Sequence, residues 1–251
     1  CHPQKAGKLA CKCAFLTRSL MGRVGRAAVK ALYARQYTTN DDYRVDSMLK
    51  AAIWALINTA MMAAPRVTAT IPSREIRPLV YAGAFIKVGE EEWHLGQAQD
   101  FEARRANNTL PEAELENGFG IVVITQGRKP IYCWGRVPVN LLRLMAVNGQ
   151  YIFMLEALAQ CIPLWIFRPL LKGPYWSFID NSAAQWALTK GYSRNSEANV
   201  LVTLCDAVAV EKGANPWFER VSSAANLSDE ISRLDFKRAE QEGWIQCKLD
   251  Y

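Results

Sequence analysis

The sequence predicts an α/β domain, a mixed sheet flanked by helices, with a small helical segment in front of it. Three observations indicate this class. Residues 5–35 alternate basic and apolar positions at helical spacing. Residues 78–139 hold three aromatic and β-branched segments bounded by Gly, Pro or polar residues, and after residue 149 helix-like and strand-like segments alternate. Half of the 251 residues are hydrophobic, so the chain can bury a core of its own.

The N-terminal region is predicted to contain several helices. Two glycines in the sequence MGRVG break residues 5–35 into short helices. The next helix is expected over residues 47–64, where Asp46 can cap the N-terminus and Pro65 ends the helix. We therefore expect a helical bundle segment that is separate from the sheet.

The net positive charge of the chain, +6, comes from this N-terminal region. Residues 1–50 contain 10 Lys or Arg against 3 Asp or Glu, and the rest of the chain has 20 against 21. Cations near phosphates release condensed counterions, so a basic segment beside a near-neutral domain favours a nucleic-acid partner. The alternative is a solvated helix face with a surplus of Lys and Arg. The candidate nucleic-acid-binding residues here are Lys8, Lys12, Arg23, Arg26 and Lys30.

The central region is predicted to form an antiparallel meander. Its strands are expected over residues 78–88, 118–125 and 130–139. A polar and charged stretch, residues 89–117, separates the first two strands. It is too long for an ordinary hairpin loop, so we interpret it as an insertion.

The C-terminal half is predicted to alternate helices and strands around two acids. Glu156 lies in an apolar helix that ends near Pro163. Asp180 ends an aromatic and β-branched strand, and Asn181 or Ser182 can cap the helix that follows. The elements expected after it are helices over residues 182–190 and 197–212 and a strand over residues 216–221.

Three acids, Glu156, Asp180 and Asp229, suggest a divalent-metal site. Glu156 has apolar neighbours on both sides, and a buried carboxylate is costly unless it is paired or bound to metal. Mg²⁺ prefers carboxylate oxygens, and two ions about 4 Å apart support phosphodiester hydrolysis. The alternatives are an exposed helix position for Glu156 and an N-cap for Asp229, a role that Asn226 or Ser228 could also fill.

Other kinds of site have little support in the sequence. Seven irregularly spaced cysteines, without paired CxxC spacing, predict neither a disulfide framework nor a zinc site. Only His2 and His94 are present for a Ser-His-Asp arrangement, and no glycine-rich phosphate loop occurs. The chain shows no signal-peptide pattern, and the apolar residues 48–64 are interrupted by Lys50 and Asn58. We expect an intracellular protein that does not enter a membrane.

Four segments together resemble the ribonuclease H domain of retrotransposon reverse transcriptases. They read FGIVV, MLEALAQ, FIDNSAAQWALTKGYS and PWFERVSSAANLSDEISRL. The last contains Asn226, Asp229, Ser232 and Arg233 in the family's spacing. The N-terminal AGKLACKCAFLTRSLMGRVGRAAVKALYARQY is similar to the thumb or connection segment that follows the polymerase palm. The likeness covers about residues 5–235.

The resemblance implies a ribonuclease H-like fold and cleavage of RNA in RNA/DNA hybrids with two Mg²⁺ or Mn²⁺ ions. It implies that Glu156, Asp180 and Asp229 are catalytic and metal-binding, and that Asn181 and Arg233 contact nucleic acid. The expected divisions are a basic thumb-like helical segment (1–66), a connector (67–77), the ribonuclease H-like domain (78–235) and a C-terminal tail (236–251).

The first acid of the family is missing from this chain. The family's first strand reads Tyr-Thr-Asp-Gly-Ala-Phe, whereas residues 81–85 read Tyr-Ala-Gly-Ala-Phe. Glu114 or Glu116 could replace that acid only if the first strand lay elsewhere. The missing acid predicts a nuclease that is weakened or inactive.

Two other functions remain open on the sequence alone. One is a noncatalytic domain that binds hybrid or duplex nucleic acid, and the other is an unrelated α/β protein whose acids are caps and surface charges. The resemblance also implies that further reverse-transcriptase domains, with the polymerase acids, precede Cys1. We therefore expect a fragment that does not polymerise by itself.

Overall fold

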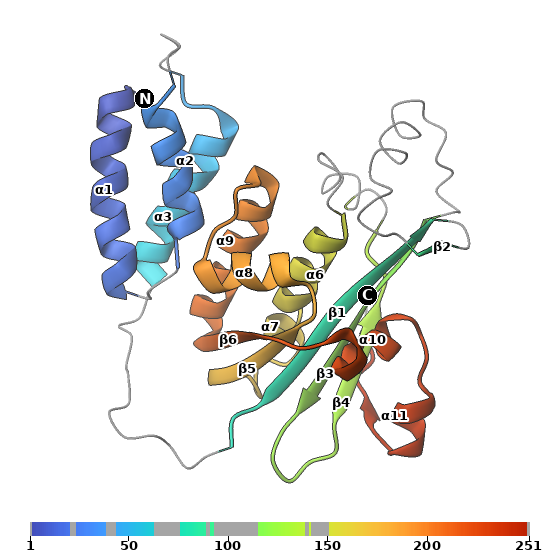
Figure 1. Cartoon of the computed structure of the whole chain (residues 1–251). Helices are drawn as coiled ribbons and strands as arrows, with labels where there is room; N and C mark the ends of the chain where they lie inside the picture. Colours follow the sequence, from blue (N-terminus) through green and yellow to red (C-terminus); the bar gives the residue numbers. More distant parts are fainter. Residues whose placement is uncertain are drawn as a thin grey trace. The chain divides into compact units, whose positions relative to one another are not determined.

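The chain folds into two compact units (Figure 1). The structure, a computed structural model, describes residues 2–20, 24–38, 44–62, 76–88, 91–92, 115–138, 141 and 151–249. We call Cys1–Glu75 with Trp186–Asn215 the helical unit, and Ile76–Gln185 with Pro216–Tyr251 the sheet unit. Residues 186–215, which we predicted inside the ribonuclease H-like domain, thus group with the N-terminal helices.

The helical unit contains the helices that the N-terminal sequence predicts. Its elements are α1 (Pro3–Leu20), α2 (Arg26–Gln36), α3 (Ser47–Met62), the end of α8 (Ser182–Lys190) and α9 (Ser196–Lys212). The predicted cap of α3 is confirmed, because Asp46 Oδ1 accepts a hydrogen bond from the Leu49 amide at 2.7 Å. Among the described helices, none is both long enough and apolar enough to cross a membrane.

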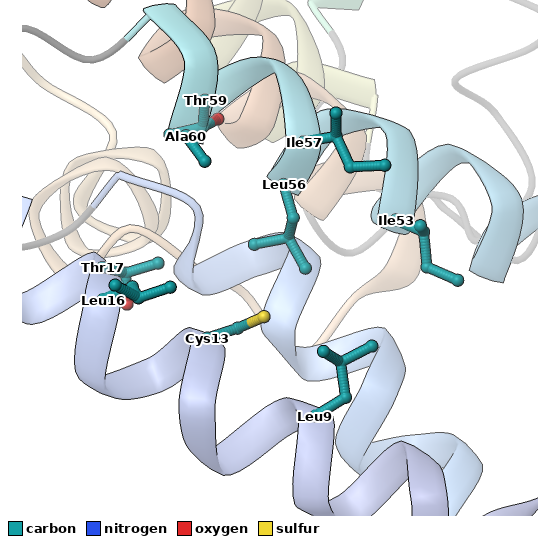
Figure 2. Close-up of a pocket in the computed structure, with 9 residues that line it drawn as sticks. All are labelled: Leu9, Cys13, Leu16, Thr17, Ile53, Leu56, Ile57, Thr59 and Ala60. Carbon is teal, nitrogen blue, oxygen red and sulfur yellow. The ribbon is translucent and has the colours of Figure 1, made fainter.

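Small and aliphatic side chains pack between the helices of this unit. Ala10, Val29, Leu32 and Leu49 form a buried cluster. Figure 2 shows a small groove in which residues of α1 face residues of α3. The facing residues labelled there are Leu9, Cys13 and Leu16 from α1 and Ile53, Leu56 and Ile57 from α3.

The sheet unit is built on one mixed sheet, which confirms the predicted fold class. Among the described residues the strands lie in the order β6-β5-β1-β3-β4-β7, and β2 pairs with β1. The strands are β1 (Leu79–Val88), β2 (Glu91–Glu92), β3 (Leu115–Ile124), β4 (Ile131–Gly135), β5 (Gly173–Ile179), β6 (Ala214–Arg220) and β7 (Ile245–Gln246). The antiparallel β1-β3-β4 meander and the parallel β1-β5 pair agree with a ribonuclease H-like sheet.

Helices cover both sides of this sheet. They are α6 (Tyr151–Cys161), α7 (Pro163–Ile166), α10 (Leu227–Ser232) and α11 (Lys237–Gln241), with a short 3₁₀ turn at Ser223–Ala225. Figure 1 shows α6 and α10 on opposite sides of β1. Helices on both faces shield the central strands from water, as a layered α/β fold requires.

The register of β1 creates the space for a site. β1 pairs with β3 along its whole length. It pairs with β5 only from Leu79↔Trp176 to Tyr81↔Phe178. Both strands continue beyond that point in the same direction but are no longer paired with each other. Their carboxyl ends therefore leave an opening between them at one end of the sheet.

The sheet unit continues past residue 235, where we predicted a tail to begin. Ala239 of α11 is buried in a cluster with Val122, Tyr132 and Ile231. The strand β7 then pairs in parallel with β4. Residues 236–249 therefore complete the sheet and its cover.

Candidate active site

The three predicted acids come from three different elements and line one pocket. Glu156 belongs to α6, Asp180 follows β5 directly, and Asp229 lies in the first turn of α10. The pocket has a volume of about 250 Å³, and Asn181 and Arg233 also line it. All five side chains predicted for this site are thus brought together from distant parts of the sequence.

Glu156 is buried, with only 3% of its surface exposed, so the alternative of an exposed helix position is wrong. Its Oε1 accepts a hydrogen bond from the Ala84 amide of β1 at 2.9 Å. Its Oε2 is buried and has no hydrogen-bond partner among the described residues. Burial, reinforced by the charge of Asp180, raises the pKa of Glu156 well above its usual value, although the bond from Ala84 opposes this.

Asp229 is partly exposed and forms an ion pair with Arg233 one turn later. Its Oδ1 lies 3.2 Å from the Arg233 Nε. Burial raises the pKa of Asp229, and the charges of Asp180 and Glu230 raise it further. Asp180 therefore perturbs both other acids, and this coupling is what three carboxylates that share one pocket should show.

Asn226, and not Asp229, caps α10. The Asn226 Oδ1 accepts hydrogen bonds from the Ser228 amide at 3.3 Å and from the Ser228 hydroxyl at 2.7 Å. The alternative of an N-cap role for Asp229 is therefore wrong. Its carboxylate lines the pocket instead.

Asp180 is placed by a sharp turn from strand to helix. Asn181 Oδ1 accepts a hydrogen bond from the Ala184 amide at 3.0 Å and so caps α8, as the sequence predicts. The cap starts the helix directly after β5, which leaves Asp180 at the carboxyl end of the strand. Asn181 itself lines the pocket beside it.

Position 83 is where a fourth acid would complete the set. Gly83 lies two residues beyond Tyr81, and Asp180 lies two residues beyond Phe178, the last pair that joins β1 to β5. A Cβ atom built on Gly83 would lie 3.7 Å from the Glu156 Oε1. By strand register, Gly83 is therefore the position of β1 that corresponds to Asp180, and it lies beside Glu156.

The space next to Gly83 is occupied by two polar side chains from α10 and its cap. A Cβ atom at position 83 would lie 2.9 Å from the Ser228 Oγ and 3.1 Å from the Asn226 Nδ2. Asn226 is buried, and its Nδ2 has no hydrogen-bond partner among the described residues. The sequence indicated Asn226 as a cap and as part of the family's motif, but not as an unpaired donor next to Gly83.

The predicted replacement acids do not supply a fourth carboxylate in the described part of the chain. Glu116 is exposed on β3 opposite Lys87 and does not line the pocket. Glu114 lies outside the described residues.

Two of the predicted nucleic-acid-binding cations also form hydrogen bonds within the helical unit. Arg26 Nη1 donates a hydrogen bond to the Lys190 carbonyl oxygen at 3.2 Å. Lys30 Nζ donates to the Ser193 carbonyl oxygen at 3.0 Å and lies 4.8 Å from the centre of the Tyr192 ring. These contacts join α2 to the end of α8 and to the residues that follow it, and they leave the positive charges of both side chains in place.

Lys8 and Lys12 remain as exposed cations on α1. Arg23 lies outside the described residues. The charge available to a phosphate backbone on this unit therefore includes the two lysines, four residues apart on one helix.

The side chains of the pocket are of the type that binds a metal ion. Three carboxylates are the ligands that a hard cation prefers, and the unpaired Glu156 Oε2 would gain a partner. Among the described residues, however, no three Asp, Glu, His or Cys side chains lie close enough together to hold an ion as they stand. The three acids therefore supply the donor type that one hard cation prefers, without the spacing of a formed site.

The comparisons with known proteins leave the family of the chain open. No protein-family model matches it, and no curated protein matches it.

Proposed function

We propose that the sheet unit is a ribonuclease H-like domain of the kind found in retroelement reverse transcriptases, which binds RNA/DNA hybrids. The convergence of Glu156, Asp180 and Asp229 on one pocket at the carboxyl ends of two parallel strands carries the proposal. Acids that serve only as caps or surface charges would have no reason to meet. Because its substrate would be nucleic acid, we place its action inside the cell.

Each acid has a distinct part in the proposed chemistry. Asp180 and Asp229 would hold a Mg²⁺ or Mn²⁺ ion together with Glu156, and the ion would neutralise phosphate charge and orient a water. The ion would also favour ionised Glu156, against the burial that raises its pKa. Arg233, held at the pocket by Asp229, offers a cation to a phosphate oxygen.

The missing acid limits this activity. With glycine at position 83, the pocket has one carboxylate fewer to hold two ions, and the Ser228 hydroxyl and the Asn226 amide lie beside that position instead. We therefore propose weak hydrolysis at most, and the second candidate function is binding of hybrid or duplex without cleavage. Gly83 is the observation that favours this second candidate.

The remaining parts of the proposal concern partners. Lys8 and Lys12 of α1 would contact the phosphate backbone, in keeping with the thumb-like or connection-like sequence of the helical unit. Upstream reverse-transcriptase domains would supply the polymerase acids.

The decisive experiment restores the fourth carboxylate in two independent ways. Gly83→Asp adds the acid directly but must displace the Ser228 hydroxyl. Asn226→Asp keeps the cap oxygen and exchanges the unpaired Nδ2 for an oxygen at almost constant volume. Each variant is incubated with an RNA/DNA hybrid and Mg²⁺ or Mn²⁺, and cleavage is compared with that of the parent chain.

The controls separate charge from shape. Gly83→Asn has the size of Gly83→Asp without its charge, and Asp180→Asn removes a proposed ligand from each background. We expect cleavage to rise in an acid-restored variant, to stay at the parent level in Gly83→Asn, and to vanish with Asp180→Asn. Parent cleavage that survives Asp180→Asn would contradict the site. Hybrid binding without cleavage in all variants would leave the noncatalytic function as the better account.

A further inference from the structure

Gln160 is a fully buried amide, one helical turn after Glu156 on α6. Its Nε2 donates to the Ala82 carbonyl oxygen of β1 at 2.8 Å and to the Phe178 carbonyl oxygen of β5 at 3.3 Å. Its Oε1 accepts from the buried Ser177 hydroxyl at 2.7 Å. In this orientation the amide nitrogen donates to two carbonyl oxygens and the amide oxygen accepts from a hydroxyl, so each polar group of the side chain has a partner. The opposite orientation would place the amide oxygen against the two carbonyl oxygens.

These bonds lie where β1 and β5 stop pairing. The last pair between the two strands is Tyr81↔Phe178. Just beyond it, Gln160 bonds to Ala82 and Glu156 bonds to the Ala84 amide. Two side chains of α6, four residues apart, thus take up backbone groups of β1 that a continued β5 ladder would otherwise use.

We infer that Gln160, supported by Ser177, is a positioning residue that keeps the ends of β1 and β5 apart and fixes the turn of α6 that carries Glu156. The hydrogen bonds of Gln160 do not depend on the proposed function, but the role in the acid site that we infer for them rests on it. An apolar residue of the same length would leave the Ala82 carbonyl and the Ser177 hydroxyl without partners in the core. Burying an amide costs free energy, and we infer that this cost is tolerated here because the amide fixes the distance between the strand ends at the acid site.

The sequence itself carries a signal for this role. Gln160 stands four residues after Glu156 in an otherwise apolar helix, where both side chains lie on one face. Two polar residues at that spacing on a buried face predict paired contacts with the same neighbouring strand.

The test compares Gln160→Met, which keeps the side-chain length, with Val123→Ala, which lowers stability from a buried position on β3. The first measurement is the hydrogen-exchange rate of the Ala84 amide, read by NMR, which reports its bond to Glu156. The two variants are compared at equal loss of thermal stability. We then expect the Ala84 amide to exchange about ten times faster in Gln160→Met than in Val123→Ala. Ser177→Ala removes one bond only and should have a smaller effect in the same direction.

The second measurement is Mn²⁺ binding, followed through the signal of the unbound ion in electron paramagnetic resonance. We expect Gln160→Met to weaken binding about tenfold and Val123→Ala to leave it unchanged. If neither the parent nor any variant binds Mn²⁺ but the Ala84 exchange responds to Gln160→Met, the proposed metal-dependent hydrolysis fails and the positioning role stands. If Ala84 exchanges equally fast in Gln160→Met and in the control, the positioning role is overturned. Should Gln160→Met not fold, the same comparison is made with Ser177→Ala.

Discussion

In the sheet unit, α10 approaches the backbone of β3 at two glycines, whereas in the helical unit the alanines of α2 and α3 face α9 across an open gap. A Cβ atom on Gly118 would lie 2.6 Å from the Ser232 carbonyl oxygen, and one on Gly120 would lie 2.4 Å from the Ser232 amide nitrogen. The gap in the helical unit measures about 810 Å³, and Ala27, Ala28 and Ala31 are among the residues that line it.

The comparison teaches that small residues permit close packing without enforcing it. In the sheet unit, α10 also contacts β1 and β4, and Ile231 fills the cluster beneath it, so helix and sheet are drawn together from several sides. In the helical unit, short alanine side chains line the gap without filling it, and Trp54 and Met48, which also line it, are 71% and 45% exposed. The acid pocket thus belongs to the more tightly packed unit, where side-chain positions are better fixed.

The largest expected effect comes from filling the close contact in the sheet unit. Gly120→Ala puts a methyl group against the backbone of α10, which cannot move as a flexible side chain would. We expect the free energy of unfolding, from urea denaturation, to fall by about 3 kcal/mol. Gly127→Ala is the control, because nothing lies within 4 Å of its Cβ and only its φ of +72° opposes the change. That variant should lose about 1 kcal/mol, and equal losses in both would refute the close-contact argument.

Tight packing around the acids predicts a stability that depends on pH through Glu156. The pKa of Glu156 is raised in the folded state. At a pH between its ordinary pKa in the unfolded chain and its raised pKa in the folded chain, the unfolded chain has released a proton that the folded chain retains. Stability therefore falls as pH rises through that window. Glu156→Gln cannot ionise and should lose less stability on going from about pH 5 to about pH 8.

The measurement is the thermal midpoint of the parent, Glu156→Gln and Glu116→Gln at both pH values. Glu116 is exposed on β3 and does not line the pocket, so its variant should follow the parent. We also expect Mn²⁺ to raise the midpoint of the parent at the higher pH and to have little effect on Glu156→Gln. Parallel pH curves for parent and Glu156→Gln would show that burial of this carboxyl costs nothing.

Local signals in the sequence were sufficient for much of the site. Asn181 caps α8 as its position before an apolar run predicts, and the apolar neighbours of Glu156 correctly indicated burial. These features depend on residues within one or two turns of each other. The same holds for the cap at Asp46.

Features that depend on distant contacts could not be read from the sequence. The charges of Arg26 and Lys30 predict a nucleic-acid partner, but nothing near them in the sequence indicates their hydrogen bonds to the Lys190 and Ser193 carbonyl oxygens, some 160 residues later. The segment after residue 235 has no long periodic pattern, and β7 forms only because β4 offers an edge. The unpaired Asn226 amide beside Gly83 likewise arises only when α10 folds onto β1.

The smallest expected effect tests the open side of the comparison. Ala31→Leu places an apolar side chain into the gap between α2, α3 and α9, where there is room for it. We expect the free energy of unfolding to rise by about 1 kcal/mol, because the added methyl groups leave water without displacing a neighbour. Ala183→Leu is the matched control, since Ala183 is exposed on α8 and does not line the gap. If Ala31→Leu instead destabilises the protein as Gly120→Ala does, the gap is closed in solution and both units pack their small residues in the same way.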